Sequence, residues 1–521
     1  MAWMRTREHF LALSPEQLWP VLSDLARLPE WNTAVAAMRP TSQDESITRG
    51  SRVDLVPLPP FVGAVHVRTA PPAVVTEFSP PAAHDDADAP PAPAGAPAAA
   101  LAWRQTQPGG GLLVRWELVP STERTTGADG EPVEIAGTLL RQRVSVDGLL
   151  AGVFAELAAK PLASRFAENC ARLYALAQNA LPDLATVPSA EAGDPDPAAA
   201  TSPAGRVKVV IAGGTGFLGR QLAADLMCRG HDIVLLTRNP EPDLPFRQAV
   251  WDGRTVAEWA GELDAAPGQR VVVVNLAGKL VDVRPTAENI AALRSSRVDS
   301  TAALVEASRG LENPVSAWVQ ASTTAIFGDA GEDLLTEDSA LPTGTAALPQ
   351  MTGVAEPWEA AAAGAHSERL HLLRTSIVLE QECPAFDRLA MLARAGLGGT
   401  VGDGRQWFSW IHLADWLSIM RGLLGLTPGL DVPAGVVNAA APEPVRNREL
   451  MRILRGALAP QPLKRRSLNT PAPLLNVGAV ALRTDPALGL TGRHVTSRVL
   501  ADAGFTFRYP DLPGAIGEIV S

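Results

Sequence analysis

Residues 207–219 read Val-Lys-Val-Val-Ile-Ala-Gly-Gly-Thr-Gly-Phe-Leu-Gly, an apolar run that leads directly into a glycine-rich turn. Gly214, Gly216 and Gly219 follow the spacing G-x-G-x-x-G, and Gly213 gives G-x-x-G-x-x-G with the last two. Glycine at these positions lets a strand turn sharply into a helix and lets the backbone approach a pyrophosphate, because no Cβ obstructs it. The N-terminus of the following helix then offers free N–H groups to the anion.

The residues after the turn support the same interpretation. Phe217 to Cys228 have a helical apolar pattern, Gly230 lies where a helix end is expected, and Ile233 to Leu236 read as a second strand. Strand, glycine turn, helix and strand in this order favour a dinucleotide site over a plain tight turn. We expect the dinucleotide to contact Gly213, Gly214, Thr215, Gly216, Phe217, Leu218 and Gly219.

The ends of the next strands indicate which dinucleotide binds. Proteins that prefer NAD place Asp or Glu after the second strand, but this chain reads Leu236-Thr237-Arg238-Asn239. Arg238 can pair with a 2′-phosphate, so the sequence favours NADP(H); the alternative is an ordinary solvated arginine. A third strand ends at Asp252, whose carboxylate could accept from the adenine amino group. A fourth strand runs into small residues that let the backbone approach the cofactor, Asn275, Leu276, Ala277 and Gly278.

Composition excludes several other classes of protein. The 521 residues carry a net charge of −11, and the one compact basic run is the short 464–466, so a nucleic-acid role is not expected. The three cysteines lie far apart without metal-ligand spacing, so we expect reduced core residues and no metal site. No run approaches the ~20 apolar residues that cross a bilayer, and the first ten residues lack an apolar signal core, so we expect no membrane span and a cytoplasmic location.

Two stretches rich in Pro, Ala, Asp and Gly divide the chain. Residues 182–205 lie just before the nucleotide-binding strand and read as a flexible linker, whereas residues 80–100 read as a long loop inside the first domain. We therefore expect a first domain over 1–181 and a dinucleotide-binding domain over 206–460, followed by a C-terminal domain over 461–521.

The first domain shows one helix start, many strands and a long final helix. Ser14-Pro15-Glu16-Gln17 predicts a capped helix, and residues 149–177 predict a long helix with a kink at Pro161. We expect strands over 5–12, 52–58, 64–70, 73–78, 101–106, 112–119 and 134–146.

This order of elements, and above all residues 14–32, resembles the START-like helix-grip fold of the polyketide cyclase and lipid-transfer superfamily. The resemblance implies an α+β domain with an apolar cavity between the sheet and the long helix, and hence a hydrophobic ligand. The alternative is a filled core, in which Trp19 and Trp31 are packing residues rather than ligand contacts.

The second part resembles the extended short-chain dehydrogenase/reductase superfamily, in a branch of epimerase-like oxidoreductases with a C-terminal domain of unknown function. This implies an α/β fold: a Rossmann-type doubly wound parallel sheet with a C-terminal substrate lobe, in which Thr375 at a strand end passes the nicotinamide. The residues that carry the resemblance are 213–219, 236–238, 275–278, 294–297, Trp358-Glu359, 402–412 with Asp415, and 490–512.

The superfamily's usual proton donor is a tyrosine whose pKa is lowered by a lysine four residues later. This chain has two tyrosines, Tyr174 and Tyr509, and neither has a lysine at that spacing. Counted back from Glu359, the tyrosine position holds Met351 and the lysine position holds Ala355. The usual chemistry therefore lacks its acid–base pair.

Few residues are candidates for a substitute role. Ser322 and Thr323 stand where the superfamily's substrate-orienting hydroxyl belongs, and simple turn capping is the alternative. His412 and Asp415 are expected to position backbone rather than to catalyse. After a glycine-rich turn, Arg405, Gln406 and Trp407 either face the substrate or form a structural loop.

The sequence thus favours an NADP(H)-dependent oxidoreductase or epimerase-like enzyme that acts on an apolar or carbonyl-bearing small molecule. One alternative is a non-catalytic NADP(H)-binding sensor or scaffold, which the missing tyrosine and lysine support. The other is a carrier of a hydrophobic ligand whose reductase-like half is regulatory.

Overall fold

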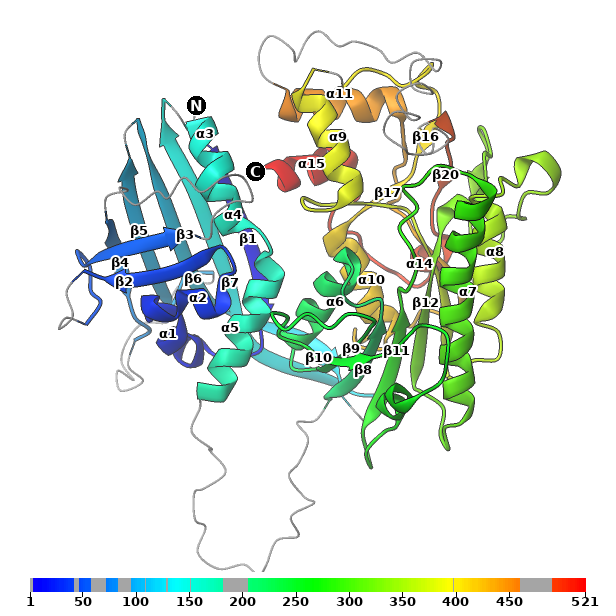
Figure 1. The fold of residues 1–521 in the computed structure, drawn as a ribbon, viewed down its shortest axis with the longest axis horizontal. Coiled ribbons are helices and arrows are strands. Elements are labelled where there is room, and N and C mark those ends of the chain that lie inside the picture. Colours follow the sequence, from blue (N-terminus) through cyan, green and yellow to red (C-terminus); the bar gives the residue numbers. More distant parts are fainter. Residues whose placement is uncertain are drawn as a thin grey trace, which may run out of the picture.

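The computed structural model describes residues 3–41, 46–57, 72–82, 95–107, 109–127, 130–149, 151–180, 205–396, 398–459 and 490–521. The chain forms two parts that lie side by side, an N-terminal antiparallel sheet with helices and a C-terminal α/β part (Figure 1). None of the helices in these ranges is both long enough and apolar enough to cross a membrane.

Seven strands of the N-terminal part form one antiparallel sheet in the order β1-β7-β6-β5-β4-β3-β2 (Figure 1). Six of the predicted strands are confirmed, β2 was not predicted, and the predicted strand over 64–70 lies outside the described residues. The strands are β1 (Trp3–Leu11), β2 (Val35–Pro40), β3 (Arg52–Pro57), β4 (Ala73–Ser79), β5 (Ala99–Gln107), β6 (Gly110–Thr126) and β7 (Pro132–Gly148).

The predicted capped helix forms as expected. The Ser14 hydroxyl accepts from the Gln17 N–H, and the Gln17 side chain accepts from the Ser14 N–H, so the capping box is complete. The short helices at this end of the chain are α1 (Pro15–Ser23), η1 (Leu25–Arg27) and α2 (Leu28–Trp31).

The predicted long helix is interrupted, but not at Pro161. The break lies at Ser164 and Arg165, where Arg165 takes a φ of 51° and donates its N–H to Glu382 of the other half. The helical conformation runs on through Pro161, because the residues just before it form a π-helical turn and Ala159 and Lys160 both keep αR dihedral angles. The segments are α3 (Ala151–Phe154), the π-helical turn η2 (Ala155–Ala159), α4 (Lys160–Ala163) and α5 (Phe166–Ala180).

The C-terminal part has a seven-stranded parallel sheet in the order β10-β9-β8-β11-β12-β14-β18, which confirms the Rossmann-type prediction. Side chains alternate along β8, so Val209 and Ile211 pack under one set of helices and Val210 and Ala212 under the other. The strands are β8 (Val207–Ala212), β9 (Asp232–Thr237), β10 (Arg247–Val250), β11 (Arg270–Asn275), β12 (Ala317–Thr323), β14 (Leu370–Thr375) and β18 (Gly435–Ala439).

Helices cover both faces of this sheet, as a doubly wound fold requires. The first face is covered by α6 (Phe217–Met227) and α10 (Leu413–Leu423), and the second by η3 (Glu258–Leu263) and α7 (Ala287–Arg309). η4 (Thr324–Phe327) and α8 (Thr352–Ala361) follow β12.

A smaller lobe stands over the carboxyl ends of the strands (Figure 1). Phe386, Trp410, Leu450 and Ile516 form its buried core, so segments far apart in sequence close over one another there. Its elements are β13 (Leu334–Leu335), η5 (Gly344–Ala346), β15 (Ile377–Leu379), α9 (Pro384–Arg394), β16 (Trp407–Phe408), β17 (Trp410–His412), β19 (Val445–Arg446), α11 (Asn447–Leu458), β20 (His494–Val495), α14 (Arg498–Asp502) and α15 (Leu512–Val520).

Candidate nucleotide and substrate site

The glycine turn is shaped by backbone crowding on both sides. Gly213 has a φ of +74°, and a Cβ there would lie 2.8 Å from the Ala277 nitrogen. A Cβ on Gly219 would lie 2.6 Å from Gly214 Cα, so only glycine lets α6 pack this closely on the turn. Gly216 is the N-cap of α6 and brings no capping side chain, so the N–H groups of the first helical turn face the space above β8.

The end of β11 lies directly beside this turn. Leu276 donates its N–H to the Ala212 carbonyl, which joins the two strand ends. The buried Asn275 amide donates to Thr301 and Gln320 and accepts from the Ala277 N–H, so it shapes the bend in the chain rather than facing a ligand. The predicted residues 275–278 and 213–219 are therefore brought together at one edge of the sheet.

The end of β9 presents a cation beside the same edge. Arg238 is exposed, and among the described residues its guanidinium has no hydrogen-bond or ion-pair partner. The neighbouring Thr237 hydroxyl is used in the turn, because it accepts from the Asn239 N–H at 3.2 Å. The structure thus leaves Arg238 free of protein partners in the described part of the chain, and its pairing with a 2′-phosphate stays a prediction.

Asp252 has a local role in the structure. Its carboxylate accepts from the N–H groups of Arg254 and Thr255 and from the Thr255 hydroxyl. The Thr255 and Arg254 hydrogen bonds hold the pKa of Asp252 below its ordinary value. The predicted contact to adenine stays a prediction, since the side chain already closes a turn.

Arg297 is a cation that sequence reasoning did not assign to the site. It lies under Gly278, where a Cβ would come within 3.0 Å of its Cζ atom. Its guanidinium stands 5.0 Å from the Trp358 ring centre and donates to the Leu293 carbonyl, and burial lowers its pKa to about 10. The only signal in sequence was its place in the 294–297 motif, which carries no chemistry by itself.

Ser322 and Thr323 face opposite sides of β12, as neighbours on a strand must. Ser322 donates to the Glu359 carboxylate at 2.5 Å, and Arg374 pairs with both oxygens of that carboxylate at 2.8 and 2.9 Å. All three side chains are nearly buried, so Ser322 is committed to a structural cluster. Thr323 accepts from the Ala325 N–H at 3.2 Å, which leaves its hydroxyl proton free to donate.

Met351 and Ala355 stand at the start of α8 and are buried. They offer no proton donor, which confirms that the usual pair is missing from this part of the fold. Arg493, from the segment before β20, instead places a guanidinium nitrogen 3.0 Å from Met351 Sδ. Sequence reasoning missed Arg493, because nothing in the local pattern of residues 490–495 shows that it returns to α8.

The three substrate candidates of the glycine-rich turn are engaged with the protein. The Trp407 ring stacks on His494 at 3.9 Å, and Arg446 lies 4.0 Å from its centre, so both ring faces are covered. Gln406 donates to the Val401 carbonyl. Arg405 is mostly exposed, and its guanidinium lies 3.9 Å from Glu332. A role toward substrate remains a prediction for these residues.

His412 and Asp415 position backbone, as expected. The Nδ1 atom of His412 accepts from the Ala414 N–H and caps α10, and Asp415 accepts from the N–H groups of Arg508 and Tyr509. Asp415 thereby ties the C-terminal segment to α10.

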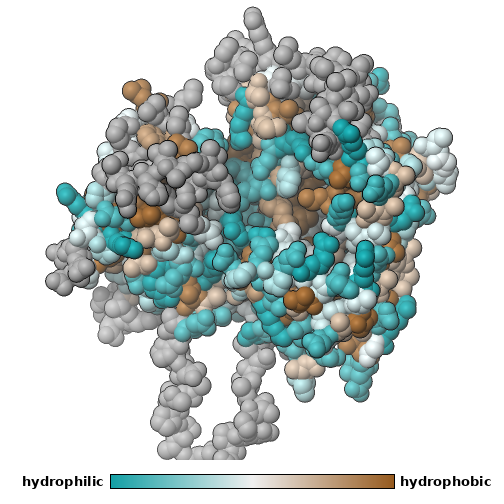
Figure 2. Space-filling view, viewed as in Figure 1, coloured by the Kyte–Doolittle hydropathy of each residue, from teal (hydrophilic) through white to brown (hydrophobic). Residues whose placement is uncertain are grey.

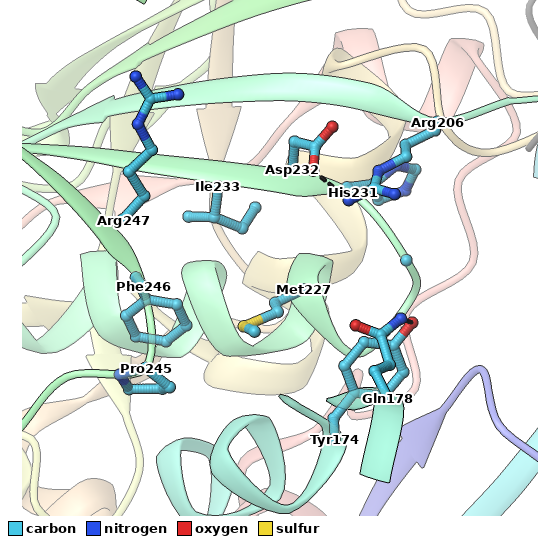
Figure 3. Close-up of a pocket in the computed structure, with 11 residues that line it drawn as sticks. Tyr174, Gln178, Arg206, Met227, His231, Asp232, Ile233, Pro245, Phe246 and Arg247 are labelled. Carbon is cyan, nitrogen blue, oxygen red and sulfur yellow. Dashed lines mark hydrogen bonds and ion pairs between the residues drawn. The ribbon is translucent and has the colours of Figure 1, made fainter. Parts of the chain in front are cut away.

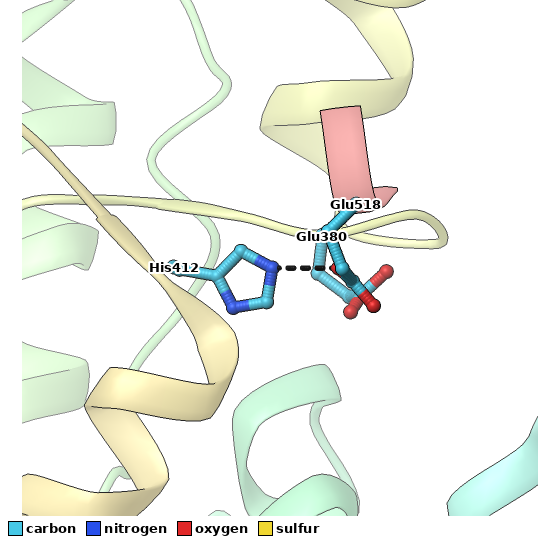
Figure 4. A group of neighbouring side chains, drawn as sticks. All are labelled: Glu380, His412 and Glu518. Atoms are coloured by element: carbon cyan, nitrogen blue, oxygen red, sulfur yellow. Dashed lines mark hydrogen bonds and ion pairs between the residues drawn. The ribbon is translucent and has the colours of Figure 1, made fainter. Parts of the chain in front are cut away.

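His412 also lies beside two carboxylates, Glu380 and Glu518, in a group that has the spacing of a metal site (Figure 4). Because Nδ1 accepts a hydrogen bond, the neutral ring carries its proton on Nε2, which lies 2.9 Å from Glu518. The imidazole then has no lone pair for a metal. Arg7 moreover pairs with Glu380, so we assign this group to hydrogen bonding and not to a metal.

A recess of about 150 Å³ lies between α5 and the edge of the parallel sheet (Figure 3). Arg206, Asp232 and Arg247 line it, and these residues stand at the amino ends of their strands. Ligands of doubly wound parallel sheets bind at the carboxyl ends of the strands. This recess lies at the amino ends, so it is not the expected place for a dinucleotide. Figure 2 shows the opposite region, between the sheet and the smaller lobe, hollowed and bordered by hydrophobic residues.

The chain matches two known families. Residues 209–348 match the NAD dependent epimerase/dehydratase family, and residues 470–519 match a domain of unknown function, DUF1731. Both matches fall in the C-terminal part.

Curated relatives and solved structures agree with these matches. The chain is 31% identical to epimerase family protein SDR39U1 of Bos taurus over 321 residues, which are 60% of this chain and 100% of that protein. It is 28% identical to epimerase family protein YfhF of Bacillus subtilis, over 60% of this chain and 98% of that protein. The crystal structure of human SDR39U1 isoform 2 with NADPH is similar with a TM-score of 0.51 and 28% identity, over 60% of this chain and 99% of that one.

One solved structure is similar over both parts of the chain. The nucleoside-diphosphate sugar epimerase of Corynebacterium glutamicum aligns with 99% of this chain and 90% of its own, with a TM-score of 0.51 and 21% identity. At this identity the similarity concerns the fold, and it extends through the N-terminal antiparallel sheet.

Proposed function

Because the chain belongs to the epimerase family that includes SDR39U1, with a DUF1731 domain at its C-terminal end, we propose that it binds NADPH and reduces or epimerises a small carbonyl-bearing or apolar molecule. The observation that carries the proposal is the unpartnered Arg238 guanidinium beside a turn in which Gly213 and Gly219 leave no room for a Cβ. The human relative solved with NADPH supports the choice of cofactor.

The residues around the turn fit this cofactor. The N–H groups at the start of α6 face a pyrophosphate, and Arg238 recognises the 2′-phosphate by a charge-assisted pair. Arg297 adds positive potential beneath Gly278 without a carboxylate partner among the described residues. NADPH supplies a hydride, and Thr375 lies at the strand end expected to pass the nicotinamide.

The residues on the substrate side favour turnover over a purely structural role. Thr323 keeps a free hydroxyl proton, and Arg493 brings a cation to the place where the usual tyrosine is missing. A sensor or scaffold would need neither. The presence of these two polar groups on the substrate side supports an enzyme.

Two measurements separate the enzyme from the sensor. NADPH binding is followed by the change in its fluorescence, and hydride transfer by rapid mixing of the loaded protein with a panel of aldehydes and ketones. We expect binding followed by oxidation of NADPH with at least one compound. Binding that changes the protein's shape without oxidation by any compound favours the sensor, and absence of binding contradicts both.

We also propose that the N-terminal part is a START-like domain that holds a hydrophobic ligand. The indole N–H groups of Trp31, Trp103 and Trp116 are buried without a hydrogen-bond partner among the described residues, and the three rings adjoin one another. Each such donor costs about 1–3 kcal/mol when unpaired, so a bound acceptor atom would relieve the cost. Mass spectrometry of small molecules released from the full chain tests this, and a ligand-free protein with a closed core contradicts it.

The cysteines bear on where the protein works. Cys170, Cys228 and Cys383 are free and buried, as expected in a reducing compartment, and this supports a cytoplasmic location.

A further inference from the structure

Arg493 is a guanidinium held entirely by neutral acceptors. Its Nε donates to the Gly328 carbonyl at 2.8 Å, and its Nη2 donates to the Thr491 hydroxyl at 2.8 Å and to Met351 Sδ at 3.0 Å. Within the described part of the chain, no carboxylate lies within 4.0 Å of it, and its Nη1 has no partner. Arg374 shows the ordinary arrangement of a buried arginine, since the Glu359 carboxylate pairs with it and neutralises its charge.

The position of Arg493 is fixed by its own backbone. Its N–H donates to the Trp407 carbonyl at 3.1 Å, and its carbonyl accepts from the Ser409 hydroxyl at 2.6 Å. The preceding Gly492 lies so close that a Cβ would stand 2.3 Å from the Trp407 nitrogen. The Asp329 carboxylate, which accepts from the Gly492 N–H, acts on this guanidinium only from a distance and makes no ion pair with it. Holding a largely desolvated cation without a paired counter-charge is costly, so a fixed arginine of this kind points to an anion that binds from outside the chain.

The guanidinium lies where the missing hydroxyl would be. Met351 occupies the tyrosine position, and a tyrosine hydroxyl there would extend beyond the point that Met351 Sδ reaches. The Nη2 atom lies 3.0 Å from this sulfur, so the guanidinium stands beside the end of the side chain at the tyrosine position. Gly328, which Arg493 holds, follows the short helix that begins after Thr323.

We propose that Arg493 is a catalytic residue that replaces the tyrosine as the group binding the substrate's carbonyl oxygen. This rests on the proposed function. When hydride from NADPH bonds to the carbonyl carbon, the C=O π pair moves to the oxygen, and the guanidinium stabilises that negative charge. NADPH becomes NADP⁺, and water supplies the proton that completes the alcohol. The arginine remains protonated throughout, because a guanidinium gives up its proton only at high pH.

A small carboxylate can stand in for the oxyanion, so oxalate is the probe. We expect calorimetry to show oxalate binding to the protein saturated with NADP⁺, and Arg493→Gln to weaken this binding at least tenfold with no change in NADPH affinity. The matched control is Arg452→Gln, since Arg452 is an exposed arginine of α11 that pairs with Glu449. Oxalate affinity should be unchanged in the control.

A second measurement needs no variant. Phenylglyoxal modifies accessible arginines, and oxalate should protect Arg493 but not Arg452 when the labelled peptides of the wild-type complex are compared. Absence of oxalate binding, equal affinity in Arg493→Gln, or equal labelling of Arg493 with and without oxalate overturns the inference. Loss of NADPH binding in the wild-type protein would instead overturn the proposed function, so the two failures are distinguishable.

Discussion

We propose that cofactor preference depends on Arg238. We expect Arg238→Asp to weaken NADPH binding by roughly tenfold to a hundredfold, because a charge-assisted hydrogen bond of about 1.5–3 kcal/mol is lost and a repulsion is added. NADH carries no 2′-phosphate, so its affinity should change little. Fluorescence titration of both cofactors measures the difference, with Arg124→Asp on the exposed face of β6 as the control. Equal losses for the two cofactors would contradict the assignment.

Ser322 and Thr323 have different partners and should respond differently to substitution. Thr323→Val removes the only free hydroxyl proton of the pair, so we expect turnover to fall about tenfold or more. It also removes the acceptor of the Ala325 N–H, which should lower the free energy of unfolding by about 1 kcal/mol. Ser322→Ala removes a hydrogen bond to Glu359 and should lower the free energy of unfolding by about 1 kcal/mol with little effect on turnover. Steady-state kinetics and thermal unfolding of both variants check this. The reverse pattern would assign the substrate role to Ser322.

At the scale of elements, the contact between β8 and α6 is the most constrained feature of the nucleotide half. Gly219→Ala would drive its Cβ into Gly214 Cα, so we expect a loss of about 1–3 kcal/mol in unfolding free energy and a marked loss of NADPH affinity. Gly456→Ala is the matched control, because a Cβ on Gly456 of α11 meets nothing within 4 Å. The control should stabilise the protein by about 0.5–1 kcal/mol. NADPH affinity unchanged in Gly219→Ala would show that the close packing is dispensable.

Sequence patterns predicted the elements that depend only on a few neighbouring residues. The glycine spacing at 213–219 and the capping box at Ser14 act over a few residues, and both are found in the structure. β2 was missed because its buried residues, Val35 and Met38, are three apart and do not alternate. The break at Arg165 depends on Glu382, which lies more than two hundred residues further along the chain, so no local pattern could place it.

The candidate site was predictable to a similar extent. Strand ends of a parallel sheet meet at one edge, so Thr323 and Arg238 could be placed at the carboxyl edge of the sheet from sequence. The choice between Ser322 and Thr323 needed Glu359, and Arg493 needed the return of the C-terminal segment to Met351.

Strand β14, which lies next to the edge strand β18 of the parallel sheet, contains a buried histidine that makes stability depend on pH. Burial lowers the pKa of His371 to about 4 from an ordinary value of 6.5. Between these values the unfolded chain binds a proton that the folded protein excludes, so unfolding free energy falls as pH falls, by about 1.4 kcal/mol per pH unit. Denaturant unfolding of wild type and His371→Asn should therefore differ in slope below pH 6.5 and run parallel above it. Parallel curves down to pH 4 would show that His371 is protonated in the folded state.

At the scale of the whole molecule, apolar packing between α5 and α6 and a set of polar contacts join the two halves. Arg229 of the nucleotide half pairs with both oxygens of Glu123, and the Ala12 N–H donates to the Cys228 carbonyl. A recess of about 320 Å³ lies between the halves, lined by Arg5 and Arg7 of β1 and by Glu380 and His412 of the lobe.

Arg7 of β1 makes ionic contacts with two carboxylates of the C-terminal part. It pairs with both oxygens of Glu380 at 3.1 and 2.5 Å, and it lies 3.8 Å from Glu518. We expect Arg7→Gln to cost about 3 kcal/mol, since it leaves the nearly buried Glu380 carboxylate without its cation. Calorimetry should then show the N-terminal sheet unfolding separately from the nucleotide half. Arg27→Gln breaks an exposed pair within one half and should cost less than about 1 kcal/mol in a single transition. A single unchanged transition in Arg7→Gln would mean that apolar packing alone makes the two halves unfold together. The ion pairs of Arg7 would then not link the N-terminal part to the nucleotide half.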